Sequence, residues 1–263
     1  MQWSGRLILA AGSMLDQPAP ILIDAAAAAG FDGVDFRLSG EHGTTALREI
    51  RAHAERVGVG IFCAEVYRIS TDATNPEPLL DAAAAVGAET VLVVSDHPDR
   101  AVTMTALTAL AVECAARGLR VGLEYMAWTD PSTAFDAIEM ANEVGCELLV
   151  DVLHHVRVGA GVDELDAVIE SGRLGWVQIC DAPLAAPGEP GHAALIHEAR
   201  HGRLLPGHGE LPVRELLARV PSDVTISVEV QSESLLGIPP IERARLLHDA
   251  ARSVLIHSPS NTG

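Results

Sequence analysis

Short apolar runs alternate with longer stretches in which apolar residues recur every three or four positions along this chain. The short runs are rich in β-branched residues, which is typical of buried parallel strands, whereas the longer stretches have the period of amphipathic helices. Such alternation indicates repeated βα units and a parallel sheet. The predicted strands span residues 6–11, 33–38, 58–66, 90–95, 120–125, 148–152, 176–180 and 224–230.

A helical segment follows each predicted strand, so the chain contains eight predicted βα units. One interval departs from the regular spacing, because residues 181–211 form a long segment rich in Gly, Pro and His after the seventh strand. We predict a loop there, and loops of that length inside a compact domain usually carry function. The predicted helices span residues 19–29, 45–57, 78–86, 102–117, 132–144, 162–171, 212–219 and 241–256.

The eight units predict an α/β fold, a single (β/α)8 barrel domain that occupies residues 1–263. A barrel of this kind typically needs about 250 residues, which matches the length of the chain. The competing architecture is a doubly wound open sheet, which usually carries a Gly-x-Gly-x-x-Gly fingerprint at its first βα turn. That turn reads Ala10-Ala11-Gly12-Ser13-Met14 here, so the closed barrel is favoured.

The charge balance narrows the choice of partners. The chain carries 36 acidic and 18 basic residues, a net charge of −18, which would repel a phosphate-rich polymer and so argues against nucleic acid. No run of about 18 apolar residues is present, and residues 1–6 do not resemble a signal peptide. We therefore expect a cytoplasmic protein with no membrane partner.

The four cysteines, Cys63, Cys114, Cys146 and Cys180, are scattered singly and form no Cys-x-x-Cys pair. Most of them lie in apolar strand or helix segments. Buried free thiols are therefore expected, and neither a disulfide framework nor a zinc site is indicated.

Polar side chains stand at the ends of four consecutive apolar strands: Glu124, Asp151, Gln178 and Glu229. In a (β/α)8 barrel the carboxyl ends of the strands surround the active site. Carboxylates buried around one rim repel each other unless they are paired or bind a cation. Three carboxylates and an amide oxygen suit one divalent ion, and Mn²⁺ or Mg²⁺ more than Zn²⁺.

Five motifs carry a family resemblance. Leu-Glu-Tyr at 123–125, Val-Asp-Val-Leu-His at 150–154 and Val-Gln-Ile-Cys-Asp at 177–181 are followed by two more. These are Gly-Arg-Leu-Leu-Pro-Gly-His-Gly-Glu-Leu at 202–211 and Ser-Val-Glu-Val at 227–230. In this order, the motifs resemble the xylose isomerase-like TIM barrel superfamily, specifically its sugar phosphate isomerase/epimerase branch.

The resemblance implies roles for particular residues. Glu124, Asp151, Gln178 and Glu229 match the family's four metal-ligand positions, whereas His154 and Arg203 match residues that contact substrate. The commoner family residue at the position of Gln178 is His. The dehydroshikimate dehydratases of bacteria in this superfamily look similar in allowing Gln there. Independently of the resemblance, Glu65 at the end of the third predicted strand points towards the rim and is a candidate substrate-binding residue.

The function that we first expect is a metal-dependent isomerase or epimerase acting on a keto sugar or related polyol. Proton transfer would proceed through an enediolate whose negative charge the ion neutralises. By resemblance, Glu124 and Glu229 are the candidate catalytic acid and base. The alternative is a lyase that dehydrates a cyclic keto-polyol such as 3-dehydroshikimate or an inosose, with a nearby His as the proton donor.

Two further interpretations remain. An apurinic endonuclease relative would need a multi-metal cluster with more histidines and a basic surface, and the sequence offers neither. A non-catalytic binding barrel would lack affinity for a divalent ion. In either enzymatic interpretation the partner is a small-molecule substrate, and the resemblance adds a homo-oligomer as an expectation.

Overall fold

A computed structural model describes residues 3–38, 43–72, 75–188 and 191–255. Within these residues eight parallel strands close into a barrel in the order of the sequence, and β1 pairs with both β2 and β8. The predicted (β/α)8 fold is therefore confirmed. The strands are β1 (Leu7–Leu9), β2 (Gly33–Arg37), β3 (Gly60–Ile69), β4 (Thr90–Ser95), β5 (Arg120–Glu124), β6 (Glu147–Asp151), β7 (Leu174–Ile179) and β8 (Thr225–Val228).

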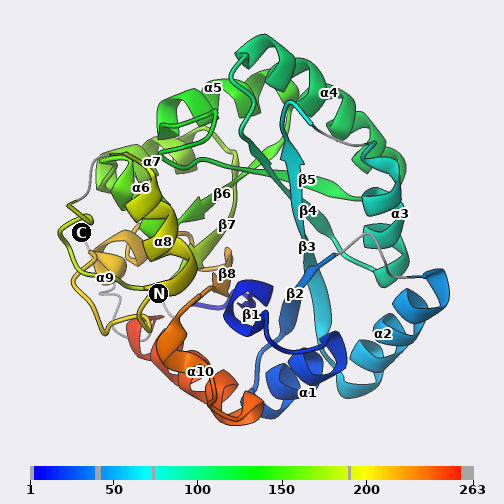
Figure 1. Cartoon of the computed structure of the whole chain (residues 1–263). Helices are drawn as coiled ribbons and strands as arrows, with labels where there is room; N and C mark the ends of the chain where they lie inside the picture. The colour runs from blue at the N-terminus through cyan, green and yellow to red at the C-terminus, as the bar shows by residue number, and fades with distance from the viewer. Residues whose placement is uncertain (1–2, 39–42, 73–74, 189–190, 256–263) are drawn as a thin grey trace.

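Helices surround the barrel as a ring (Figure 1), since each buries its apolar stripe against the outer faces of the strands. These helices are α1 (Ala19–Ala29), α2 (Thr44–Val57), α3 (Glu77–Val86), α4 (Arg100–Ala116), α5 (Ala134–Val144), α7 (Val162–Glu170), α9 (Val213–Leu217) and α10 (Pro240–Leu255). Four further elements lie in the connections after strands: η1 (Ala11–Met14), α6 (Val152–Arg157), α8 (Ala193–His201) and η2 (Glu233–Leu235).

Most predicted bounds agree with the structure to within two residues, and four differences matter for the site. β3 runs on to Ile69, because Tyr67, Arg68 and Ile69 continue to pair with β4. β8 ends at Val228, so the predicted strand end at 229–230 is wrong. The predicted loop at 181–211 contains α8, and α6 follows β6 directly. The last predicted helical residue, 256, and positions 189–190 of that loop lie outside the described residues.

The barrel interior is filled in layers by alternate strand residues, because successive side chains of a strand point to opposite faces. One layer is apolar and buried: Ile8, Phe62, Leu92, Leu149 and Trp176 cluster there. The rings of Phe62 and Trp176 meet edge to face with centroids 5.5 Å apart. This apolar plug closes the barrel beneath its mouth.

The next inward-facing layer towards the carboxyl ends is polar. Asp151 follows Leu149 by two positions on β6, and Gln178 follows Trp176 by two on β7. Glu124 ends β5, and Glu229 comes directly after β8. The same alternation that builds the apolar plug therefore gathers all four predicted polar residues at one mouth.

Two minor expectations concern the rest of the chain. All four cysteines are free and buried, which confirms the predicted thiols. In the described ranges, every helix is too short or too polar to cross a lipid bilayer.

Gly122 is required by the layer packing, because a Cβ at this position would collide with the Trp176 ring. We expect Gly122→Ala to lower the free energy of unfolding by about 1–3 kcal/mol through overpacking. Urea denaturation measures this change. Gly60→Ala is the matched control, since a Cβ there meets only the Asp32 carbonyl oxygen at 3.6 Å. Equal effects of the two substitutions would contradict the packing described.

Candidate functional site

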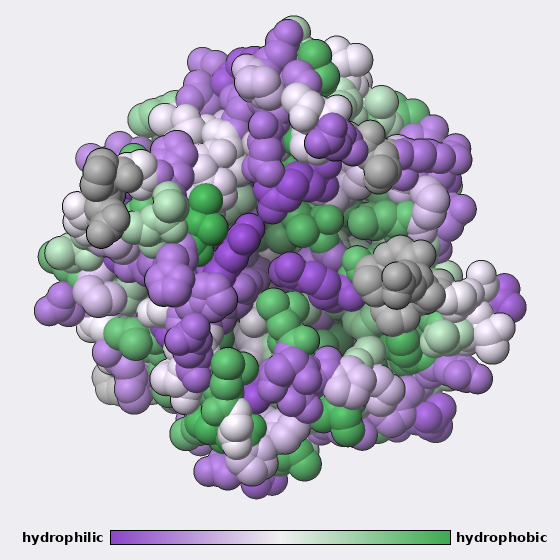
Figure 2. Space-filling model, viewed as in Figure 1, coloured by the Kyte–Doolittle hydropathy of each residue, from purple (hydrophilic) through white to green (hydrophobic). Residues whose placement is uncertain are grey.

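A pocket with a volume of about 110 Å³ opens at the carboxyl ends of the strands. Figure 2 shows the hollow on this face, bordered mostly by hydrophilic side chains. All four polar residues predicted at the strand ends contribute to the mouth: Glu124, Gln178 and Glu229 line the pocket, and Asp151 lies buried beside His154. The other lining residues are Arg37, Val66, Arg68, Leu92, Val94, Met126, Trp128, His154, Ala199, Arg200, Arg203 and Gln231.

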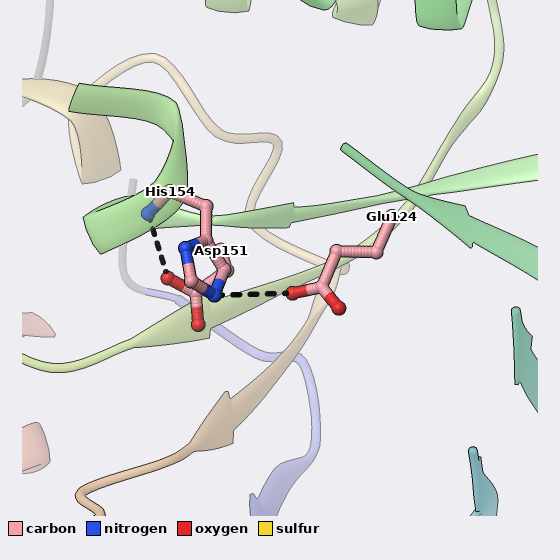
Figure 3. Close-up of side chains that lie close together, drawn as sticks. All are labelled: Glu124, Asp151 and His154. Carbon is pink, nitrogen blue, oxygen red and sulfur yellow. Dashed lines mark hydrogen bonds and ion pairs between the residues drawn. The ribbon is translucent and has the colours of Figure 1, made fainter. Parts of the chain in front are cut away.

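Glu124, Asp151 and His154 lie close together (Figure 3). Each is buried, and each offers one ligand atom within 4.8 Å of the others. His154 Nε2 lies 3.9 Å from Glu124 Oε1. Local sequence produces part of this geometry, because Asp151 is the N-cap of α6 and its Oδ1 accepts a hydrogen bond of 3.1 Å from the His154 backbone N–H.

Arg203 inserts its buried guanidinium between two of the carboxylates. Its Nη1 donates to Asp151 Oδ2 at 2.6 Å, and its Nη2 lies 3.0 Å from Glu229 Oε2. The Nε donates to the Ala199 carbonyl oxygen at 2.8 Å, which fixes the side chain from α8. Nη2 also lies 3.4 Å from His154 Nε2. Because a guanidinium only donates, this histidine nitrogen accepts the hydrogen bond.

The burial and charges of the mouth set its protonation. Burial, followed by the charges of Asp151 and Glu229, raises the pKa of Glu124 well above its usual value. Burial alone would raise the pKa of Asp151, but the charges of Arg203 and His154 and the hydrogen bonds from both residues together lower that pKa. Burial, aided by Arg203 and opposed by Asp151, lowers the pKa of His154 to about 4, so the imidazole is neutral near pH 7.

The donors at the mouth fit a divalent ion. Glu124, Asp151 and Glu229 together can carry three negative charges, and Arg203 contributes one positive charge. One divalent cation would balance the remaining two. The neutral His154 lies beside this donor set, and its buried Nδ1 has no hydrogen-bond partner among the described residues.

Glu65 is placed differently from the other candidates. It is buried and does not line the pocket, but its Oε2 accepts a hydrogen bond of 3.1 Å from Arg37, which does. Burial, opposed by Arg37, raises the pKa of Glu65 to about 7. Glu65 therefore supports Arg37 from behind the pocket wall, and a direct contact with substrate stays a prediction.

The sequence analysis missed two pocket arginines, Arg37 and Arg68, and did not predict the helix that carries a third, Arg200. Arg37 ends β2, and Arg68 lies next to the last residue of β3, beyond the predicted end of that strand, whereas Arg200 belongs to the unpredicted α8. The inward alternation of β2 was the available signal for Arg37. Trp128 also lines the pocket, and its ring meets that of His154 edge to face at 5.1 Å.

Comparison with known proteins places the chain in a family. A family model described as xylose isomerase-like TIM barrel matches residues 23–254. The chain belongs to this family. The resemblance seen in the sequence motifs is therefore confirmed at the level of the xylose isomerase-like TIM barrels.

Individual relatives of this xylose isomerase-like barrel share less than a third of its residues. The barrel is 28% identical over 258 residues to a 3-dehydroshikimate dehydratase of Pseudomonas aeruginosa, across 90% of this chain and 39% of the relative. A 3-dehydroshikimate dehydratase of Pseudomonas putida is 24% identical with the same coverage. The barrel thus spans about two fifths of the length of the curated relatives it matches.

A solved structure described as the IOLI protein with a bound zinc atom shares the fold with a TM-score of 0.80. The two sequences are 14% identical, and the alignment covers 97% of this barrel and 99% of that chain.

Arg203→Met tests the charge balance of the mouth. Removing one partner of a buried ion pair costs about 3–5 kcal/mol, and we expect that loss of unfolding free energy near pH 7 in the presence of a chelator. The loss should shrink as the pH falls towards about 4. In the wild type the low pKa of Asp151 gives stability that is present above the ordinary aspartate pKa and lost on acidification. In the variant, which lacks the charge of Arg203, burial favours the protonated form of Asp151 instead.

Urea denaturation across this pH range measures the difference between the two proteins. Arg219→Met is the control, because Arg219 makes a similar two-bond pair with Asp166 on the surface. A loss that is independent of pH, or equal for the two variants, would contradict the charge balance.

Proposed function

We propose that this chain is a metal-dependent lyase that dehydrates 3-dehydroshikimate to protocatechuate. The observation that carries the proposal is the match of 90% of the chain to proteins named 3-dehydroshikimate dehydratase. It favours the dehydratase alternative over the isomerase or epimerase that the motifs first suggested. The relatives are longer than this chain, so their whole activity is a proposal here.

The pocket chemistry supports an anionic substrate. Although the chain has a net charge of −18, the pocket is lined by four arginines. Arg203 is committed to Asp151 and Glu229, and Arg37 and Arg68 pair with Glu65 and Asp96. Arg200 is exposed on α8 at the pocket wall. We assign Arg200 to the substrate carboxylate, with Arg37 and Arg68 adding positive potential.

Glu124, Asp151, Gln178 and Glu229 would hold the divalent ion, whether Mn²⁺, Mg²⁺ or Zn²⁺. A glutamine amide oxygen is a competent ligand for such an ion. When bound, the ion would stabilise the negative charge that develops on the ketone oxygen as the neighbouring C–H bond is broken. His154, beside these residues, is left to move protons.

The reaction removes one molecule of water. A proton leaves the carbon next to the ketone, for which Glu124 and Glu229 are the candidate acceptors. The C–H electron pair forms a carbon–carbon double bond and expels the hydroxyl from the β-carbon. Because His154 Nε2 accepts from Arg203, its proton lies on Nδ1, which can donate to the leaving hydroxyl. Loss of a second ring proton, with protonation of the ketone oxygen, completes the aromatic ring.

The purified protein, incubated with 3-dehydroshikimate and added Mn²⁺, should produce protocatechuate, followed by its absorbance and by chromatography. A chelator should abolish the activity, and a divalent ion should restore it. Glu124→Gln should lower kcat by about 10²–10⁴-fold. Glu139→Gln is the matched control, because that side chain is 78% exposed and does not line the pocket.

A panel of ketoses separates the two enzyme classes. Epimerisation of a ketose without any conversion of 3-dehydroshikimate would overturn the proposal in favour of the isomerase interpretation.

A further inference from the structure

A buried ion pair outside the pocket joins α6 to α8. Arg157 is the last residue of α6 and Glu198 lies in α8, and their side chains are only 3% and 9% exposed. Arg157 donates through Nε to Glu198 Oε2 at 2.8 Å and through Nη2 to Oε1 at 2.7 Å. Such a two-bond fork fixes orientation as well as distance. The same guanidinium donates to the carbonyl oxygens of Pro183 and Leu184 at 2.7 and 3.1 Å.

Few apolar contacts hold α8 against the rest of the barrel. A surface helix is normally held by an apolar stripe, but the buried residues of α8 are Glu198 and Ala199 alone. His192, at its N-cap, gives no side-chain capping bond. The Arg157–Glu198 pair is therefore an important buried attachment of α8, which also has an exposed contact of 3.7 Å between His201 and Glu233.

The inner side of α8 reaches the candidate site. Ala199 and Arg200 line the pocket, and the Ala199 carbonyl oxygen accepts the hydrogen bond from Arg203 Nε. α6 is tied to the same site through Asp151, its N-cap. Figure 1 shows α6 and α8 side by side at one edge of the barrel, where the ion pair joins them. The two helices thus hold Arg203 from two directions.

We propose that Arg157 and Glu198 are positioning residues, which set α8 so that Arg203 and Arg200 are correctly placed for the reaction. The pair touches neither the pocket nor the four candidate ligands. Its effect on turnover rests on the proposed function, whereas its effect on α8 does not. A buried pair in itself is weak support for stability, so its use in fixing one arrangement of two segments is the better explanation.

Glu198→Gln keeps the size of the side chain and removes its charge. We expect faster backbone hydrogen exchange confined to residues 193–203, measured by mass spectrometry, with unchanged exchange in the strands. With 3-dehydroshikimate, kcat/KM should fall by about 10²-fold, as for a small misplacement of positioning groups. Glu198→Asp keeps the charge, so it should recover part of the exchange protection at residues 193–203 and part of kcat/KM.

Asp166→Asn is the matched control. It breaks a two-bond pair with Arg219 of the same kind, at 2.8 and 2.6 Å, away from the pocket. This variant should leave exchange at residues 193–203 and kcat/KM unchanged. If Glu198→Gln does not fold, Arg157→Lys serves instead, because lysine keeps the charge but cannot form the fork.

Unchanged exchange at residues 193–203 in Glu198→Gln, or in Arg157→Lys where that variant replaces it, would overturn the inference. So would faster exchange throughout the barrel, since the pair would then hold the fold as a whole. If the wild type does not convert 3-dehydroshikimate, the proposed function fails. The exchange comparison would still decide whether the pair positions α8.

Discussion

Negative charge concentrated at the barrel mouth is the constraint on which this structure depends. Strand alternation turns Glu124, Asp151 and Glu229 inward above an apolar plug, where water screens them poorly. Arg203 offsets one of these charges and binds two of the carboxylates. Burial and the remaining charge raise the pKa of Glu124, and that charge makes the mouth a good place for a divalent cation.

Much of this arrangement follows from local sequence pattern. The period-two alternation that identifies a strand also says which side chains face the barrel axis, so the polar strand ends could be predicted to converge. Asp151 caps the helix after its own strand, which brings His154 to the site through contacts only three residues apart.

The contacts that complete the mouth could not be predicted in this way. Arg203 meets Asp151 across 52 positions, and Arg157 meets Glu198 across 41. Nothing near either arginine in sequence indicates its partner, because the approach depends on how the connection after β7 folds back. α8 was missed for a related reason: its buried residues are Glu198 and Ala199, so it lacks the apolar stripe by which a helix is recognised.

The most direct measurement is elemental analysis of the purified protein together with calorimetric titration of Mn²⁺ and Zn²⁺ into chelator-treated protein. The account predicts one divalent ion per chain, and much weaker binding when Glu124 is replaced by Gln. Absence of a bound ion, with no affinity for either added metal, would contradict it, since the charge at the mouth would then be balanced by protonation and Arg203 alone.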